Sequence, residues 1–145
     1  MVLLRFEYYV SKGLVKRRRK NVRLAESLMN SALDRMEFAK QILQTKPRYA
    51  LEMAYEAVIE LIDALLALEG FKSWSHEANI AFLSKIGFSE VELRRFDITR
   101  KKRHSSKYYG ATFSLEEADK EIVYIERLFK KVLAEVKKKL GSKHK

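Results

Sequence analysis

The chain has 145 residues, contains no cysteine and carries a formal net charge of +11 at neutral pH. The length fits one domain with its own core, and the lack of cysteine excludes disulfides, thiolate zinc sites and cysteine nucleophiles. The longest apolar run, residues 54–68, is interrupted by carboxylates, and no signal-peptide pattern is present, so the sequence predicts a cytoplasmic protein without a membrane span.

The charge is unevenly distributed along the chain. Residues 1–23 carry a net charge of +7, residues 24–90 of −4, residues 91–110 of +5 and residues 111–145 of +3. Basic ends around an acidic middle favour a polyanionic partner such as nucleic acid, because phosphate contacts release counterions and supply non-specific affinity. A basic surface that serves only solubility or heat tolerance is the alternative.

The N-terminal third of the chain is predicted to contain an arm and a long helix. Residues 1–10 show no clear period, which leaves open a short helix or an extended arm that packs on a partner chain; such an arm would extend over residues 1–15. Residues 16–20 are a basic run whose like charges would oppose the macrodipole of the following helix. The run would therefore fray into a basic arm, bind an anion or be solvated. From about residue 14 to residue 45, apolar residues recur in helical steps of three and four: Leu24, Leu28, Ala32, Met36, Ala39 and Leu43.

The next helix is predicted from Pro47, which suits a first helical turn, to Glu69. Nearly all of its positions are apolar, so we expect it to be the central, buried helix. Four carboxylates form an acidic stripe within an arc of about 80°: Glu52, Glu56, Glu60 and Asp63. This stripe must face water, a basic helix of the same chain or a second subunit.

Glycine and a capping serine follow the central helix. Gly70 is expected to end it, and residues 71–74 form a short connection whose Trp74 is assigned to the core or to an interface. Ser75 then caps a helix over residues 76–86.

Two serine-glutamate capping boxes, at residues 89–92 and 114–117, predict two more helices. The first should stop near residues 105–106, before a loop over residues 107–113. The second should end before a flexible basic tail, residues 141–145. No stretch alternates with period two for long enough to predict a strand. The sequence therefore predicts one all-α domain over residues 1–145, an antiparallel up-and-down bundle of four to five helices.

Basic residues, a histidine and paired tyrosines converge in one stretch, residues 97–110. At about 100° per residue, Arg100, Arg103 and His104 share one arc, which continues the inward apolar face of their helix. A surface helix has no packing reason to replace core residues with these side chains. The sequence therefore predicts a polar pocket here, and the alternative is that the bundle ends at this point.

Arginine and histidine can together cleave RNA without a metal ion. A histidine moves the 2′-hydroxyl proton, while an arginine holds the phosphate and stabilises charge in the transition state. The predicted roles are general acid or base for His104 and phosphate clamp for Arg100 or Arg103. A basic helix end that favours the macrodipole explains the same residues without chemistry. His76 is assigned a capping or structural role in preference to a catalytic one.

Six residues of the same stretch are assigned to nucleic-acid or nucleotide binding: Asp97, Lys101, Lys102, Lys107, Tyr108 and Tyr109. The aspartate would orient or partly neutralise Arg100, the lysines would attract phosphate, and the tyrosines would stack a base or close the bundle. No metal and no cofactor are predicted, because the chain has three histidines and lacks the Glu-x-x-His pairs of ferritin-like bundles.

Four features of residues 20–140 together resemble the HEPN domain family. They are the acidic stripe, Ser-His-Glu after a Gly-Phe-Lys connection, the segment Arg-Lys-Lys-Arg-His-Ser-Ser-Lys-Tyr-Tyr-Gly, and a last helix that opens Ser-Leu-Glu-Glu. The resemblance implies an all-α bundle that forms a homodimer, with the arginine-histidine motifs of two chains meeting in a cleft. Members of the family include metal-independent ribonucleases, often toxins, and partners of minimal nucleotidyltransferases in toxin–antitoxin pairs.

The spacing of the arginine and the histidine departs from the family pattern of an arginine, four to six residues and a histidine. Three residues separate Arg100 from His104, and eight separate Arg95 from His104. Arg103 and His104, followed by two tyrosines, are closer to a variant branch of the family. The resemblance therefore leaves three functions open: a metal-independent ribonuclease, a non-catalytic partner module of a minimal nucleotidyltransferase, and RNA binding without cleavage.

Overall fold

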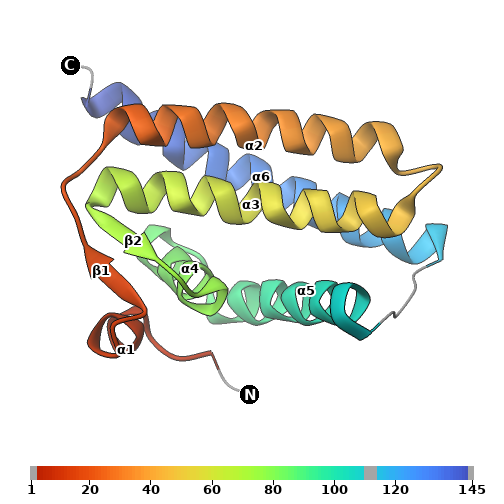
Figure 1. Ribbon diagram of the computed structural model, residues 1–145, viewed down its shortest axis with the longest axis horizontal. Coiled ribbons are helices and arrows are strands. Elements are labelled where there is room, and N and C mark those ends of the chain that lie inside the picture. The colour runs from red at the N-terminus through yellow and green to blue at the C-terminus, as the bar shows by residue number, and fades with distance from the viewer. Residues whose placement is uncertain (1–2, 110–113, 144–145) are drawn as a thin grey trace.

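The computed structural model describes the backbone of residues 3–109 and 114–143, and the side chains of residues 3–105 and 114–142 (Figure 1). The prediction of an all-α bundle is confirmed, because helices dominate the described residues and the two strands have three residues each. The elements in chain order are α1 (Phe6–Ser11), β1 (Val15–Arg17), α2 (Val22–Ile42), α3 (Pro47–Glu69), β2 (Phe71–Ser73), α4 (His76–Phe82), a 3₁₀ turn (Leu83–Ile86), α5 (Glu90–Tyr109) and α6 (Leu115–Lys143).

The long helices form an antiparallel bundle. Figure 1 shows α2, α3 and α6 side by side, while α4 and α5 lie along another side of α3 and the β-strands with α1 lie at one end. Consecutive long helices alternate in direction. No helix in the described residues combines the length and the apolar composition that crossing a bilayer requires.

Helix α3 occupies the centre of the bundle, as predicted. Pro47 stands in its first turn, and Gly70 ends it with a left-handed φ of +86°. Most of its 23 residues are buried, and it contacts α2, α4, α5 and α6. Fully buried Tyr55 is among the largest side chains of the core. Every other long helix therefore takes its position from this one.

Two carboxylates of the acidic stripe face arginines of the same chain. Glu60 accepts a hydrogen bond from Arg35 Nε of α2 at 3.1 Å, and Glu56 accepts one from Arg103 of α5. The sequence left three surroundings open for the stripe. At these two positions, the surrounding found is a basic residue of the same chain. The stripe ties α2 and α5 to the central helix.

The prediction of a helix from residue 14 is wrong for residues 14–21. Residues 15–17 form β1, which pairs antiparallel with β2 and places Val15 opposite Ser73. Val15 is buried in the core, and pairing with β2 satisfies the backbone in an extended conformation. The basic run 16–20 therefore lies outside the helix and ends directly before the N-cap Asn21 of α2, instead of forming its first turns.

Side-chain caps begin four of the helices. Asn21 and Ser75 accept backbone N–H groups in the first turns of α2 and α4. Both predicted capping boxes are confirmed: the Ser89 and Ser114 hydroxyls accept N–H groups of α5 and α6, and a glutamate three residues further accepts the serine N–H in return. The starts of these helices are thus set by local chemistry.

Both predicted helix ends near the C-terminus are wrong. Helix α5 continues to Tyr109, so it does not stop near residues 105–106 and residues 107–109 are not a loop. Helix α6 passes through Gly141 and reaches Lys143. Serine and glycine cost a helix only about 0.5–1 kcal/mol each, which is too little to end one that packs on a core. The rest of the predicted loop and tail, residues 110–113 and 144–145, lies outside the described residues.

The N-terminal segment folds onto its own chain. Its α1 is a short helix whose buried Phe6 packs edge-on against Phe71 and Phe82, with ring centroids 5.3 Å and 5.1 Å apart. Of the two predicted alternatives, the short helix is therefore the one observed.

Gly70 combines a left-handed backbone with a close approach to the backbone just after β1, so Gly70→Ala should destabilise the fold. A Cβ at this position would lie 2.9 Å from the carbonyl oxygen of Arg18. We expect urea denaturation to show a loss of about 1–2 kcal/mol or more. Gly141→Ala is the matched control, because its methyl group would meet open space and alanine favours a helix by about 0.5–1 kcal/mol. Equal losses in both variants would contradict this explanation.

Candidate functional site

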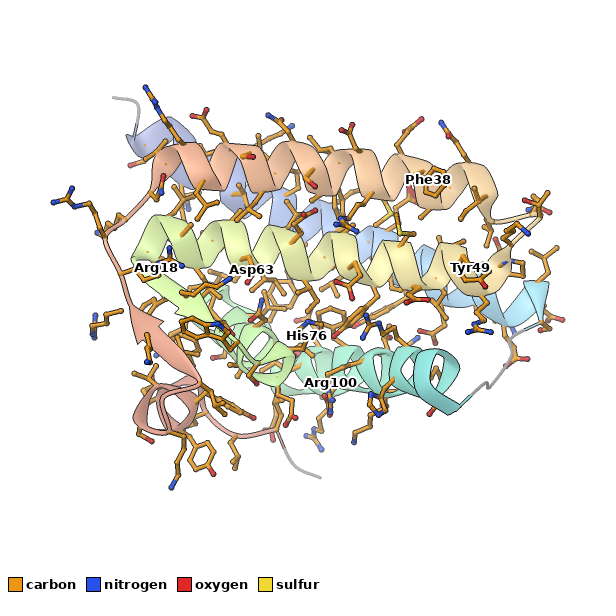
Figure 2. The ribbon with its side chains drawn as sticks, in the orientation of Figure 1. Arg18, Phe38, Tyr49, Asp63, His76 and Arg100 are labelled. Carbon is orange, nitrogen blue, oxygen red and sulfur yellow. The ribbon has the colours of Figure 1, made fainter. Side chains whose placement is uncertain are left out.

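A polar cleft of about 420 Å³ lies where the start of α4 meets α5. We call it the α4–α5 cleft; its polar and aromatic lining is Trp74, His76, Glu77, Arg100, Arg103 and His104. Figure 2 shows His76 of α4 and Arg100 of α5 where these helices meet. The three residues predicted to share a pocket, Arg100, Arg103 and His104, all line this cleft.

Arg100 is held in place by carboxylates. Its side chain is 18% exposed, and its Nε donates to Oδ1 of Asp97 at 2.7 Å. Its Nη1 lies 3.9 Å from Oε1 of Glu77, across the cleft. Burial by itself lowers the pKa of Arg100, but the hydrogen bond and charge of Asp97 outweigh it and raise this pKa. Arg100 therefore stays cationic, and the buried Asp97 orients it as the sequence predicted.

Arg103 is the more deeply seated arginine, with a side chain that is 12% exposed. Its Nη2 donates to Oε1 of Glu56 at 2.5 Å, and its guanidinium carbon lies 5.5 Å from the ring centre of Tyr55. Its Nε is buried without a hydrogen-bond partner among the described residues. The central helix α3 thus supplies both an anion and an aromatic face that fix this guanidinium in the cleft.

His76 also lines the cleft, although the sequence analysis assigned it a capping or structural role in preference to a catalytic one. Its Nδ1 lies 2.8 Å from the hydroxyl oxygen of Tyr55, and Ser75 rather than His76 caps the helix. Burial, and to a smaller extent the charge of Glu56, raise the pKa of Tyr55, so this hydroxyl stays protonated and orients the imidazole. A histidine in a first helical turn gains nothing from the macrodipole, and this unfavourable placement is the signal that could have identified it.

Trp74 is not a core residue, because 61% of it is exposed. It sits at the end of β2 and lines the same cleft as His104, which comes from α5. The alternative that places it at an interface stays open. The cleft therefore combines cationic, imidazole and aromatic groups from two separate segments of the chain, residues 74–77 and 100–104.

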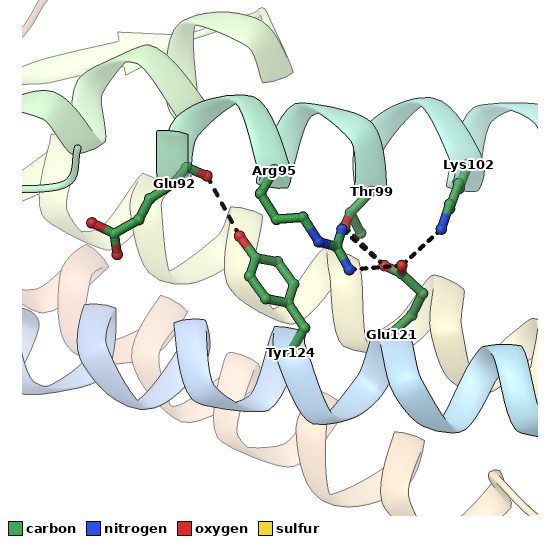
Figure 3. A network of polar contacts seen from close by, with 6 residues as sticks. All are labelled: Glu92, Arg95, Thr99, Lys102, Glu121 and Tyr124. Carbon is green, nitrogen blue, oxygen red and sulfur yellow. Dashed lines mark hydrogen bonds and ion pairs between the residues drawn. The ribbon is translucent and has the colours of Figure 1, made fainter. Parts of the chain in front are cut away.

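Lys102 does not belong to the cleft. It lies on the side of α5 that faces α6, where its Nζ is 2.8 Å from Oε1 of Glu121 (Figure 3). Lys101 does not line the cleft either, and its Nζ lies 3.5 Å from Oδ2 of Asp97. The side chains of Lys107, Tyr108 and Tyr109 lie outside the described residues, so their binding roles stay predictions.

A second polar cluster fastens α5 to α6. Glu121 is buried and accepts hydrogen bonds from Arg95, Thr99 and Lys102 (Figure 3). Burial raises the pKa of Glu121, but these hydrogen bonds outweigh it and lower the pKa overall. The guanidinium of Arg95 also lies 4.1 Å from the ring centre of Tyr124. This cluster sets the rotation of α5, and with it the direction in which Arg100 and Arg103 point.

Glu121→Gln should therefore destabilise the protein at neutral pH, by about 2–3 kcal/mol, because charge-assisted hydrogen bonds are lost from a buried site. A carboxylate with a lowered pKa stabilises the fold above its unfolded pKa, and this contribution disappears as the pH falls through the folded pKa. The difference between the two proteins in urea unfolding should accordingly shrink below about pH 4. Glu116→Gln, at an exposed site of the same helix, is the control. A difference that stays constant down to pH 2 would exclude the ionised carboxylate as its source.

Within the described residues, no group of three histidines and carboxylates is placed to hold a metal ion. The prediction of a site without metal therefore stays a prediction that experiment has to test.

Comparisons with protein-family models, with curated proteins and with solved structures give no match for this chain. The resemblance to HEPN domains accordingly stays a prediction from the sequence. The basis for a function is therefore the α4–α5 cleft, in which two arginines and two histidines meet.

Proposed function

We propose that the chain is a HEPN-like domain that binds RNA in the α4–α5 cleft and cleaves it without a metal ion. The observation that carries this proposal is the meeting of Arg100, Arg103, His76 and His104 in one cleft. Cleavage of RNA by its own 2′-hydroxyl needs one base, one acid and cations at the phosphate. One chain supplies all of these groups.

The proposed reaction has one transesterification step. One histidine takes the proton of the 2′-hydroxyl, the 2′-oxygen attacks the adjacent phosphorus, and the bond from phosphorus to the 5′-oxygen breaks. The other histidine gives a proton to the departing 5′-oxygen. The products are a 2′,3′-cyclic phosphate and a 5′-hydroxyl. Because Nδ1 of His76 is hydrogen-bonded to Tyr55, His76 would exchange its proton with the substrate at Nε2.

The two arginines are proposed as the phosphate clamp. Each is oriented by a carboxylate, Asp97 for Arg100 and Glu56 for Arg103, so little reorganisation is needed when negative charge develops on the phosphate. A guanidinium remains charged at any pH that RNA tolerates, and its planar donors match two phosphate oxygens. The mostly buried position of both side chains strengthens their field in the cleft.

The proposal includes a homodimer. Phe38 of α2 and Tyr49 of α3 are about half exposed (Figure 2), and they border a hollow of about 730 Å³ that Arg103 also lines. A second copy seated on this hollow would lie beside the phosphate clamp. A minimal nucleotidyltransferase partner would use the same apolar surface, which makes the non-catalytic partner module the second candidate function.

Incubation of the purified protein with RNA in excess chelator tests the proposal. We expect cleavage, a 2′,3′-cyclic phosphate on the upstream product by mass spectrometry, and no cleavage of the same sequence made as DNA. His104→Ala, prepared in parallel, excludes a contaminating nuclease if its preparation is inactive. Salt-sensitive RNA binding without products would instead favour an RNA-binding module. Absence of both binding and cleavage would refute the proposed function and favour the partner module, and sedimentation velocity measures the dimer separately.

A further inference from the structure

Trp74 is the residue that the proposed reaction leaves without a role. It is the only tryptophan of the chain, and 61% of it is exposed, which is unusual for the largest side chain. Its backbone is fixed, because its N–H donates to the carbonyl oxygen of Leu14 at 2.9 Å. The indole is therefore attached to a fixed backbone position, and it lines the α4–α5 cleft.

Two lysines flank the indole. Nζ of Lys16 lies 5.9 Å from its ring, and Nζ of Lys72 lies 5.8 Å from it. These lysines are directly opposite each other on β1 and β2, and like charges at directly opposite positions destabilise a strand pair. The fold therefore keeps a repulsive pair beside an exposed aromatic face, and an anion that joins them would relieve the repulsion.

The charge around Trp74 distinguishes between two kinds of partner. Tryptophan at the centre of a protein interface is surrounded by apolar and neutral side chains, and charged residues are depleted there. Here the neighbours are Lys16, Lys72 and the cationic end of the cleft, while Glu77 is paired with Arg100. A flat aromatic face among cations suits a nucleobase with its phosphates, because every base has a π-face that stacks on an aromatic ring.

We infer that Trp74 stacks an unpaired base of RNA next to the phosphate held in the α4–α5 cleft, with Lys16 and Lys72 on the flanking phosphates. This inference rests on the proposed function and specifies its substrate class as single-stranded RNA. A base inside a duplex is stacked on both faces by its neighbours and cannot stack on a side chain without first being extruded. The cleft therefore selects loops, ends and unpaired segments over duplexes.

Intrinsic fluorescence tests the inference directly, because Trp74 is the only tryptophan in the chain. The His104→Ala protein, in which cleavage is slowed, is titrated with a single-stranded RNA of mixed sequence and with the matching duplex. We expect the single strand to quench the fluorescence to saturation and the duplex to leave it nearly unchanged. In a separate anisotropy assay with labelled RNA, Trp74→Ala should weaken single-strand binding by roughly 5- to 100-fold.

The controls separate stacking from folding. Trp74→Phe keeps an aromatic face and should retain most of the affinity, whereas Val91→Ala changes an exposed apolar residue away from the cleft and should have no effect. Unchanged single-strand binding by Trp74→Ala, or equal quenching by the duplex, would overturn the inference. The inference would also be overturned if the quenching depended only on the protein concentration and not on RNA, because Trp74 would then be a protein–protein contact. Cleavage by the wild-type protein is scored independently, so the inference can fail while the proposed function stands.

Discussion

Replacement of either cleft histidine by alanine should reduce RNA cleavage by roughly 10²- to 10⁴-fold, the contribution of a positioned acid or base. This expectation applies to His104, which the sequence predicted as the general acid or base, and to His76, which lines the same cleft from another helix. Two groups that act in opposite protonation states produce a bell-shaped dependence of rate on pH. His76→Ala and His104→Ala should therefore each remove one limb of that profile.

Single-turnover kinetics between pH 5 and 9 measure this effect. Arg94→Ala is the matched control, since Arg94 is an exposed residue of α5 that pairs with Glu90 and does not line the cleft. Tyr55→Phe removes the hydroxyl that orients His76, so it should slow cleavage less than His76→Ala and keep the shape of the profile. Full activity of both histidine variants would exclude the proposed acid and base.

Arg103→Ala should reduce the rate of RNA cleavage by roughly 10²- to 10³-fold, because a preorganised cation at the phosphate is lost. The same substitution leaves Glu56 as a partly buried carboxylate without its guanidinium, which should lower the free energy of unfolding by about 1–3 kcal/mol. A loss of activity could thus come from a loss of structure. The two causes have to be separated by a second substitution.

Glu56→Gln combined with Arg103→Ala provides that separation. The neutral amide needs no cationic partner, so urea unfolding should show stability partly restored relative to Arg103→Ala alone. Cleavage should stay as low as in the single variant, because the phosphate clamp is still missing. Arg103→Lys keeps the charge but not the planar fork of donors, and it should recover only part of the activity. Recovery of cleavage together with stability in the double variant would reduce Arg103 to a structural residue.

Local sequence patterns predicted the helices well where short-range chemistry decides them. Pro47, Gly70 and the serine caps act on neighbouring residues, so their effects can be read from spacing alone. The predictions failed where packing outweighed these signals. Val15 is drawn into the core and pairs with β2, and Gly141 continues a helix that its core contacts already stabilise.

The sequence by itself determined that α3 is central and that Arg100, Arg103 and His104 share one face of α5, because the helical period fixes which residues of one helix point the same way. Only the tertiary structure decided which groups stand opposite them. Tyr55 and Glu56 come from α3, and Trp74 and His76 from the end of β2 and the start of α4. No periodicity links segments that are some 20 to 50 residues apart, so their meeting depends on how the helices pack. The same packing turned Lys102 towards Glu121 and away from the cleft. It also brought His76, to which the sequence assigned a capping or structural role, into the cleft of the predicted arginines.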